Sequence, residues 1–154
     1  MDKVFYLTSE NREELRKLLP GVLASGDLVL LLCAKWCGTC SSFEEVAAEL
    51  KPRFPNTLFL WIDIEDDSVV AGDVDIINFP TLAIFRNGVV VHYGVSLPHQ
   101  GVVKRLLTAV LVNPIRQADA PNEVLELPQK MLEWLEHTND SSVISQYHGV
   151  SSSY

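Results

Sequence analysis

The sequence has little cysteine, little positive charge and no long apolar run. Its 154 residues include three cysteines, which is an odd number and too few for the disulfide framework of a small secreted protein. Lys and Arg number 12 against 20 Asp and Glu, so the net charge of −8 argues against nucleic acid and anionic membranes as partners. The longest uncharged apolar run, residues 28–34, is far shorter than the ~20 residues of a membrane-spanning helix.

The first residues also lack the pattern of a secretory leader. Residues 1–8 show no basic segment and no long apolar stretch before a small-residue cleavage site, so we expect no secretory signal. Together with the scarcity of cysteine, this favours a reducing, cytoplasmic compartment.

The residues that are present suffice for one globular domain. Hydrophobic residues make up 47% of the chain, which is too rich for wholesale disorder. A chain of this length can bury a core without disulfides to support it.

Four features predict the strands of a sheet. Continuous apolar runs at residues 28–34 and 58–64 favour strands that are buried on both faces, and residues 4–7 have strand character. Two β-rich runs within residues 81–93 flank Asn87-Gly88, which is a strong hairpin signal.

Three stretches predict helices between these strands. The first is expected to be capped by Ser9 and to be ended or interrupted by Pro20-Gly21. Residues 39–50 repeat apolar side chains at helical spacing. Ser96 is expected to cap the third helix, with Pro98 in its first turn. The order of the elements predicts an α/β sandwich with a central mixed sheet flanked by helices.

The remainder of the chain has a different pattern. We expect a first domain at residues 1–112, a linker with one short amphipathic helix at 113–137, and a disordered tail at 138–154 whose serine-rich composition cannot bury a core. The helix carries apolar Met131, Leu132, Trp134 and Leu135, which either dock on their own domain or bind a protein partner.

The chemically distinctive segment is Trp36-Cys37-Gly38-Thr39-Cys40, where a buried strand passes into an amphipathic helix. Two cysteines with two residues between them can close a small disulfide ring. The first falls at the helix N-terminus, where free N–H groups and the helix dipole favour a thiolate. A thiolate is the nucleophile of thiol–disulfide exchange, and a second cysteine can resolve the mixed disulfide.

Two separated motifs carry a family resemblance. Residues 34–40 resemble the active-site segment of thioredoxins, usually written WCGPC, and Phe79-Pro80-Thr81 before the hairpin looks like the family's cis-proline loop. The resemblance covers roughly residues 1–112 and implies a thioredoxin-like sandwich with a C-terminal extension.

The resemblance also implies roles for individual residues. Cys37 would attack and the buried Cys40 would resolve, so that the redox-active group is a Cys37–Cys40 disulfide. The implied substrate-binding residues are Trp36, Gly38, Thr39, Phe79, Pro80 (as a cis-proline), Gly94 and Val95. No organic cofactor and no metal are implied, and the expected partners are protein thiols or disulfides and an electron-donating reductase.

Several positions depart from the family pattern, among them Glu45, which stands where the family has a proline that kinks the following helix. Leu31 stands where most thioredoxins have a buried aspartate, Trp61 where a lysine often pairs with it, and Thr39 where the motif has proline. The aspartate normally helps to move the proton of the resolving cysteine. We therefore expect an apolar floor that makes the Cys40 thiol harder to ionise.

Plainer readings of these residues remain open. The cysteine pair could be inert and buried, or half of a zinc site, although the other Cys and His residues lack ligand spacing. Cys33 is expected in the core, with a redox role as the alternative. Phe79-Pro80 could form a plain turn, and the acidic run 65–67 a solvated loop.

Two functions of different classes follow. The first is a protein thiol–disulfide oxidoreductase that uses the Cys-Gly-Thr-Cys dithiol. The alternative is a non-enzymatic binding or chaperone-like module that uses the same groove and the C-terminal extension, because fold does not fix function.

Overall fold

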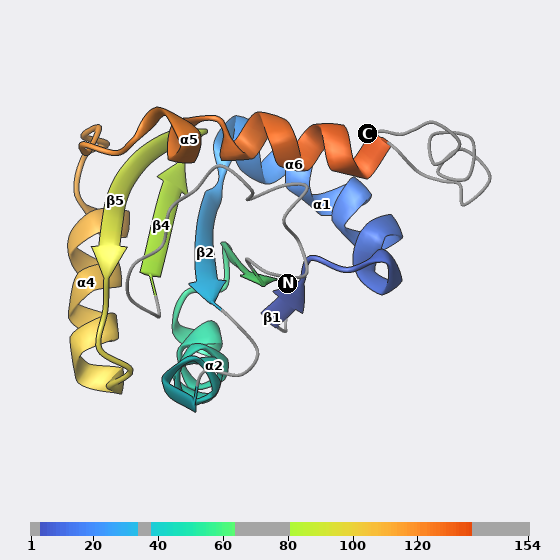
Figure 1. Ribbon diagram of the computed structural model, residues 1–154. Helices are drawn as coiled ribbons and strands as arrows, with labels where there is room; N and C mark the ends of the chain where they lie inside the picture. The colour runs from blue at the N-terminus through green and yellow to red at the C-terminus, as the bar shows by residue number, and fades with distance from the viewer. Residues whose placement is uncertain (1–3, 34–37, 64–80, 137–154) are drawn as a thin grey trace.

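A five-stranded mixed sheet runs through the part of the chain that the computed structural model describes, which comprises residues 4–33, 38–63 and 81–136 (Figure 1). The strands are β1 (Val4–Tyr6), β2 (Asp27–Cys33), β3 (Thr57–Asp63), β4 (Thr81–Arg86) and β5 (Val89–Val95). Their order in the sheet is β1-β3-β2-β4-β5. The first three are parallel, while β4 and β5 run antiparallel to their neighbours, which confirms the predicted mixed sheet.

The hairpin between β4 and β5 turns where the sequence predicts it. Asn87 and Gly88 both have positive φ, at 53° and 81°, which matches the two left-handed central residues of a type I′ turn. A Cβ on Gly88 would also lie 3.1 Å from the carbonyl oxygen of Leu23. Glycine is therefore needed there for backbone conformation and for space.

Helices cover both faces of the sheet. They are α1 (Arg12–Ser25), α2 (Gly38–Leu50), α4 (Gln100–Val112), α5 (Asn122–Leu125) and α6 (Leu127–Glu136), with 3₁₀ turns η1 (Ser9–Asn11) and η2 (Lys51–Arg53). One core cluster joins the sheet to α1, α5 and α6, and the other joins it to α2 and α4. None of the helices in the described ranges is long and apolar enough to span a membrane.

The start and length of α1 differ from the prediction. Ser9 opens a 3₁₀ turn, and the α-helix begins at Arg12 instead. Pro20 does not end it, since the helix runs on to Ser25. Leu19 and Val22, on either side of this proline, are buried, and their burial offsets the roughly 3 kcal/mol cost of a proline inside a helix.

Ser96 does not cap the helix that follows β5, contrary to the prediction. Its hydroxyl donates to the carbonyl of Leu97, and α4 begins only at Gln100, with the His99 carbonyl accepting from the Val103 N–H. A proline disfavours helical geometry at the residue before it, so Pro98 keeps Leu97 out of the helix.

The C-terminal extension is docked on the body of the domain. Where one short helix is expected, the structure has α5 and α6, and α6 lies beside α1 (Figure 1). Four of their apolar side chains are buried in the same core as the sheet: Val124, Leu127, Met131 and Leu135. Of the two alternatives for the amphipathic helix, the structure shows the docked one.

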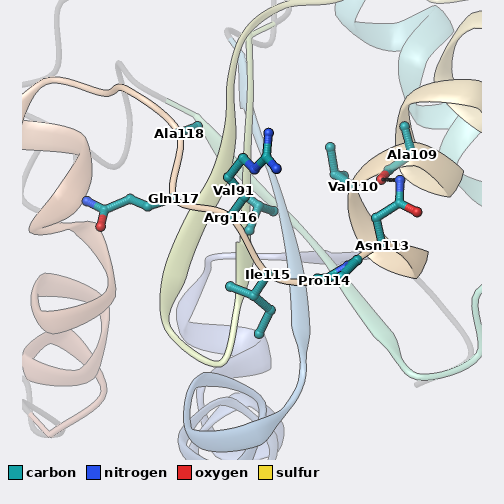
Figure 2. A pocket seen from close by; sticks show the side chains of 9 residues that line it. All are labelled: Val91, Ala109, Val110, Asn113, Pro114, Ile115, Arg116, Gln117 and Ala118. Atoms are coloured by element: carbon teal, nitrogen blue, oxygen red, sulfur yellow. Dashed lines mark hydrogen bonds between the residues drawn. The ribbon is translucent and has the colours of Figure 1, made fainter.

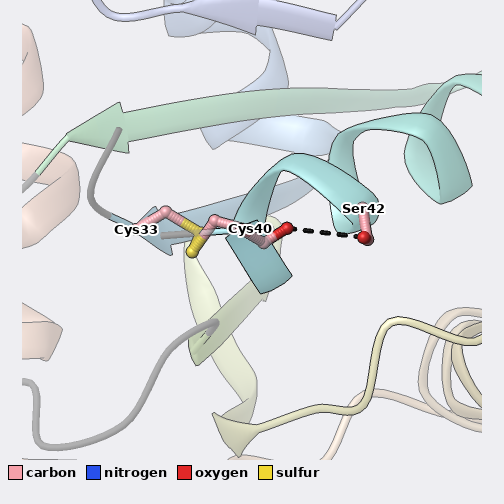
Figure 3. Close-up of a disulfide and its surroundings, with 4 residues drawn as sticks. Cys33, Cys40 and Ser42 are labelled. Carbon is pink, nitrogen blue, oxygen red and sulfur yellow. Dashed lines mark hydrogen bonds between the residues drawn. A yellow bond between two sulfur atoms is a disulfide. The ribbon is translucent and has the colours of Figure 1, made fainter. Parts of the chain in front are cut away.

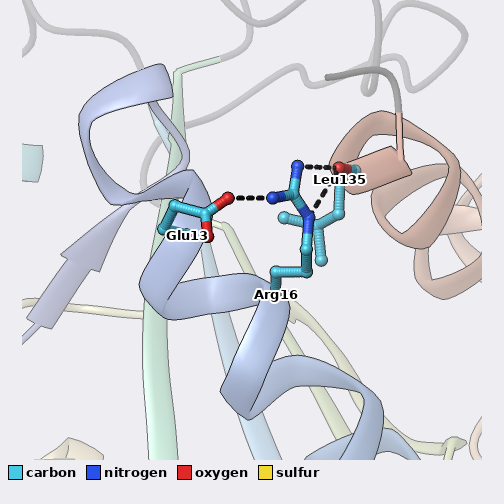
Figure 4. A network of polar contacts seen from close by, with 3 residues as sticks. All are labelled: Glu13, Arg16 and Leu135. Carbon is cyan, nitrogen blue, oxygen red and sulfur yellow. Dashed lines mark hydrogen bonds and ion pairs between the residues drawn. The ribbon is translucent and has the colours of Figure 1, made fainter. Parts of the chain in front are cut away.

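Two arginines of α1 contact the last turn of α6. Arg16 donates from Nε and Nη2 to the carbonyl oxygen of Leu135, at 3.2 and 2.7 Å, and also pairs with Glu13 (Figure 4). A cation at the last carbonyls of a helix is favourable because the helix dipole is negative there. One turn earlier, the Arg12 guanidinium lies 4.1 Å from the centre of the Trp134 ring.

Candidate active site

The ends of three strands meet where the sequence places the site. Thr81, the first residue of β4, pairs with Leu32 near the end of β2 and with Val95 at the end of β5. Helix α2 begins at Gly38, only five residues after β2 ends at Cys33. The tertiary structure thus brings the end of β2, the start of β4 and the end of β5 to one edge of the sheet.

A disulfide joins the end of β2 to the first turn of α2. It links Cys33 to Cys40, whose Cα atoms are 5.9 Å apart, within the usual range for disulfides (Figure 3). Both side chains are fully buried. The expected partner of Cys40 was Cys37, which lies outside the described residues. Cys33 has the expected core position, and the structure additionally gives it a bond to Cys40.

The floor beneath this disulfide is apolar, as the sequence predicts. Leu31 and Trp61 are partners in the β2–β3 register and belong to the same core cluster as both cysteines. The Trp61 indole Nε1 is buried with no hydrogen-bond partner among the described residues. The nearest register position with a carboxylate is Asp63, a buried residue paired with Cys33 at the end of β3.

The positive end of the α2 dipole lies at Gly38, where the helix begins. No acidic residue lies in the first turn, so the positive end of the helix dipole is not neutralised there. The Ser42 hydroxyl donates to the carbonyl of Gly38 at 3.4 Å (Figure 3). By its place in the sequence, Cys37 directly precedes this helix.

The structure describes some of the predicted site residues and not others. Gly38 is exposed at the start of α2, and Gly94 and Val95 end β5. Thr39 belongs to α2. The other predicted residues lie outside the described ranges: Trp36, Cys37, Phe79 and Pro80.

Three residues at this edge were missed or undervalued by the sequence reasoning. Cys33 lies two residues after Leu31 on β2, so both side chains point to the same face of the sheet. This alternation could have predicted that Cys33 faces α2 and Cys40. Asp63 likewise lies two residues after Trp61 on β3, so these two side chains point to the same face of the sheet. Leu97 is 59% exposed, as is Val95 two residues earlier at 56%, and no local sequence pattern marks this exposure.

His92 on β5 and Glu44 on α2 have shifted pKa values. Burial lowers the pKa of His92, and its Nε2 has no hydrogen-bond partner among the described residues. Burial raises the pKa of Glu44 on α2, and repulsion from the negative charge of Glu45 raises it further. Within the described ranges, no three His, Cys, Asp or Glu residues gather as metal ligands.

A separate pocket lies between β5 and the end of α4, with the chain after α4 along its rim (Figure 2). Its volume is about 530 Å³, and its lining consists of Val91, Ala109, Val110, Asn113, Pro114, Ile115, Arg116, Gln117 and Ala118. It contains none of the predicted site residues and no cysteine, so it is not the centre of the thiol chemistry.

Comparisons with known proteins agree with this geometry. A family model described as Thioredoxin matches residues 7–107. Human protein disulfide-isomerase A4 is 27% identical over 150 residues, which cover 94% of this chain and 21% of that protein, so the chain spans only a small part of this relative. A thioredoxin of Chlamydia trachomatis is 28% identical over 86 residues, covering 56% of this chain and 84% of that protein.

Solved structures show the same fold. A mutant thioredoxin from Halobacterium salinarum gives a TM-score of 0.56 at 22% identity, covering 78% of this chain and 96% of that one. A thioredoxin from Nicotiana alata gives 0.56 at 22% identity, with 70% and 91% covered.

Proposed function

The chain belongs to the thioredoxin family, and from that premise we propose that it is a thiol–disulfide oxidoreductase acting on protein disulfides. The observation that carries the proposal is the placement of Cys40. It lies fully buried in the first turn of α2 and is bonded to another cysteine, which supports a redox role for this residue.

In this proposal Cys37 attacks and Cys40 resolves. Cys37 directly precedes α2 in the sequence, and the first N–H groups of a helix have no partner within it. The first turn of α2 holds no acidic residue, so the helix dipole there also favours a thiolate. The thiolate of Cys37 attacks a substrate disulfide and forms a mixed disulfide, releasing one substrate thiol. Cys40 then attacks the Cys37 sulfur and releases the second.

The proposed substrate groove is built around the converging strand ends. Trp36, Gly38 and Thr39 flank the cysteines in the sequence, and Phe79-Pro80 immediately precede β4. Support comes from the end of β5, where Gly94 and Val95 pair with the first two residues of β4. Exposed Val95 and Leu97 supply an apolar rim suited to a peptide side chain.

The chemistry needs no organic cofactor or metal, because the two electrons reside in the dithiol. We propose protein thiols or disulfides as substrates and a reductase as the electron donor. With Leu31 and Trp61 beneath Cys40, resolution is expected to be the slow step, since an apolar site disfavours the thiolate.

Reduction of insulin by dithiothreitol tests the proposal. The wild-type chain should accelerate insulin precipitation, Cys37→Ser should abolish the acceleration, and Ser41→Ala, an exposed change in the same helix, should leave it unchanged. A wild-type rate equal to that of dithiothreitol alone would refute the proposal and favour the non-enzymatic binding module.

Alkylation of the reduced chain tests the assigned roles. Iodoacetamide near neutral pH should modify Cys37 before the buried Cys40. If Cys40 is labelled first, the roles of the two cysteines are wrongly assigned.

A further inference from the structure

We propose that Cys33 is a second redox partner of Cys40, so that the oxidised protein holds its disulfide as the buried Cys33–Cys40 pair and returns Cys37 to the thiol form. The pairing itself is a feature of the structure. Its part in catalysis rests on the proposed function, in which Cys37 is the attacking residue.

The geometry of the pair fits a bond that forms without rearranging the backbone. Cys33 ends a central strand and Cys40 sits in the first turn of the helix packed on that strand, with 5.9 Å between their Cα atoms. This separation is near the commonest value in disulfides. The end of β2 and the first turn of α2 thus hold the two cysteines at bonding distance.

The surroundings favour the disulfide over the thiolates. Both cysteines are fully buried in the core cluster that contains Leu31, Phe43 and Trp61. A charged thiolate is disfavoured there by desolvation, whereas a neutral disulfide carries no such cost. The burial also keeps external thiols from reaching the bond directly.

The chemical steps balance. Cys37 attacks a protein disulfide, and Cys40 then attacks the Cys37 sulfur, which breaks the mixed disulfide and leaves a Cys37–Cys40 bond with two reduced substrate thiols. The Cys33 thiol next loses its proton and attacks the Cys40 sulfur, forming Cys33–Cys40 and expelling Cys37, which takes up a proton. This last step is an exchange within the chain, so it transfers no net electrons, and the Cys33 proton passes to Cys37.

The exchange changes what the oxidised protein does. With Cys40 bonded to Cys33, a substrate captured by Cys37 has no resolving thiol in reach. An external dithiol must therefore restore the protein through Cys37, by reversing the internal exchange. The oxidised state captures substrates instead of reducing them.

Peptide mapping of the full wild-type chain tests the pairing directly. Lys35 lies between Cys33 and Cys37, so trypsin separates Cys33 from the other two cysteines. After oxidation with oxidised glutathione and blocking with iodoacetamide, we expect two peptides joined by a disulfide, with the alkyl group on Cys37. A disulfide confined to the peptide of Cys37 and Cys40, or an alkyl group on Cys40, would overturn the proposal.

A redox titration tests the contribution of Cys33 to the equilibrium. Suppose that oxidised molecules with the Cys33–Cys40 bond outnumber those with the Cys37–Cys40 bond about tenfold. Cys33→Ala leaves only the second kind, so the equilibrium constant for oxidation should fall about elevenfold. The reduction potential of the protein should then shift by about 30 mV toward easier reduction. Val29→Ala shortens another buried side chain of the same strand and cluster, and it should leave the midpoint in place. An unmoved midpoint in Cys33→Ala would contradict the proposal.

The two proposals fail in different ways. If wild type reduces insulin but shows no link between the peptides, the role of Cys33 is refuted and the oxidoreductase stands. If the link forms but insulin reduction does not depend on Cys37, the proposed function and the catalytic part of this inference are both refuted.

Discussion

Replacing Leu31 by aspartate would put a proton acceptor on the apolar floor beneath Cys40. Leu31 is fully buried and paired in register with Trp61, so the new carboxyl group enters a site shaped for an aliphatic side chain. Resolution of a mixed disulfide requires the Cys40 thiolate, and a nearby carboxylate can take up that proton. The substitution should therefore accelerate resolution while it destabilises the fold.

The cost in stability follows from the burial of Leu31. Removing a buried leucine side chain costs about 2–5 kcal/mol, and burying a polar group without an arranged partner adds about 1–3 kcal/mol. The sum of about 3–8 kcal/mol approaches the about 5–15 kcal/mol stability of a typical domain. Leu31→Asn supplies the matched control, because it has the same shape and a similar cost but no carboxylate.

The gain in rate follows from the ionisation of a thiol. A free cysteine is only a few per cent thiolate at about pH 7, and apolar burial lowers that fraction. General-base catalysis contributes about 10²–10⁴-fold where the base is well placed. A buried aspartate is itself partly protonated, so we expect a smaller effect, of about tenfold or more, in Leu31→Asp relative to Leu31→Asn.

The assay separates attack from resolution. A chromogenic aryl disulfide releases one equivalent of coloured thiol when Cys37 attacks and a second when Cys40 resolves, so stopped-flow absorbance records the two phases. Circular dichroism establishes that both variants are folded at the assay temperature. Equal second-phase rates in the two folded variants would refute the argument and indicate that proton removal from Cys40 does not limit resolution.

Three further predictions concern stability. Burial lowers the pKa of His92 below its ordinary 6.5, so on acidification the unfolded chain protonates this imidazole at a higher pH than the folded chain does. The free energy of unfolding should therefore decrease as the pH falls below 6.5, and it should decrease less in His92→Gln. Met131→Ala, in a buried position of α6, should cost about 2–5 kcal/mol in urea unfolding, against a few tenths for exposed Leu125→Ala. Truncation after residue 138 should leave the melting temperature nearly unchanged, and a large drop would show that the tail packs on the domain.

The strands and α2 could be predicted because their signals are local. The runs that became β2 and β3 are apolar on both faces, and the α2 stripe, which ends at Leu50, repeats at helical spacing. Asn87-Gly88 predicts its turn through a local backbone preference, since both residues have positive φ. The start and end of α1 and the start of α4 were placed wrongly. Core burial around Pro20 lets α1 continue, and Pro98 keeps the residue before it out of α4.

The sequence by itself determined the fold class and the dithiol motif at the start of a helix. It also determined that Leu31 and Trp61 stand where most thioredoxins have polar residues. These depend on residue type and spacing, which any reader of the chain can see. Only the tertiary structure decided that Cys33 bonds to Cys40 and that α6 completes the core against α1. The reason is physical: a disulfide or a helix contact depends on the distance between separate elements, and that distance is set by how the whole sheet and its helices pack.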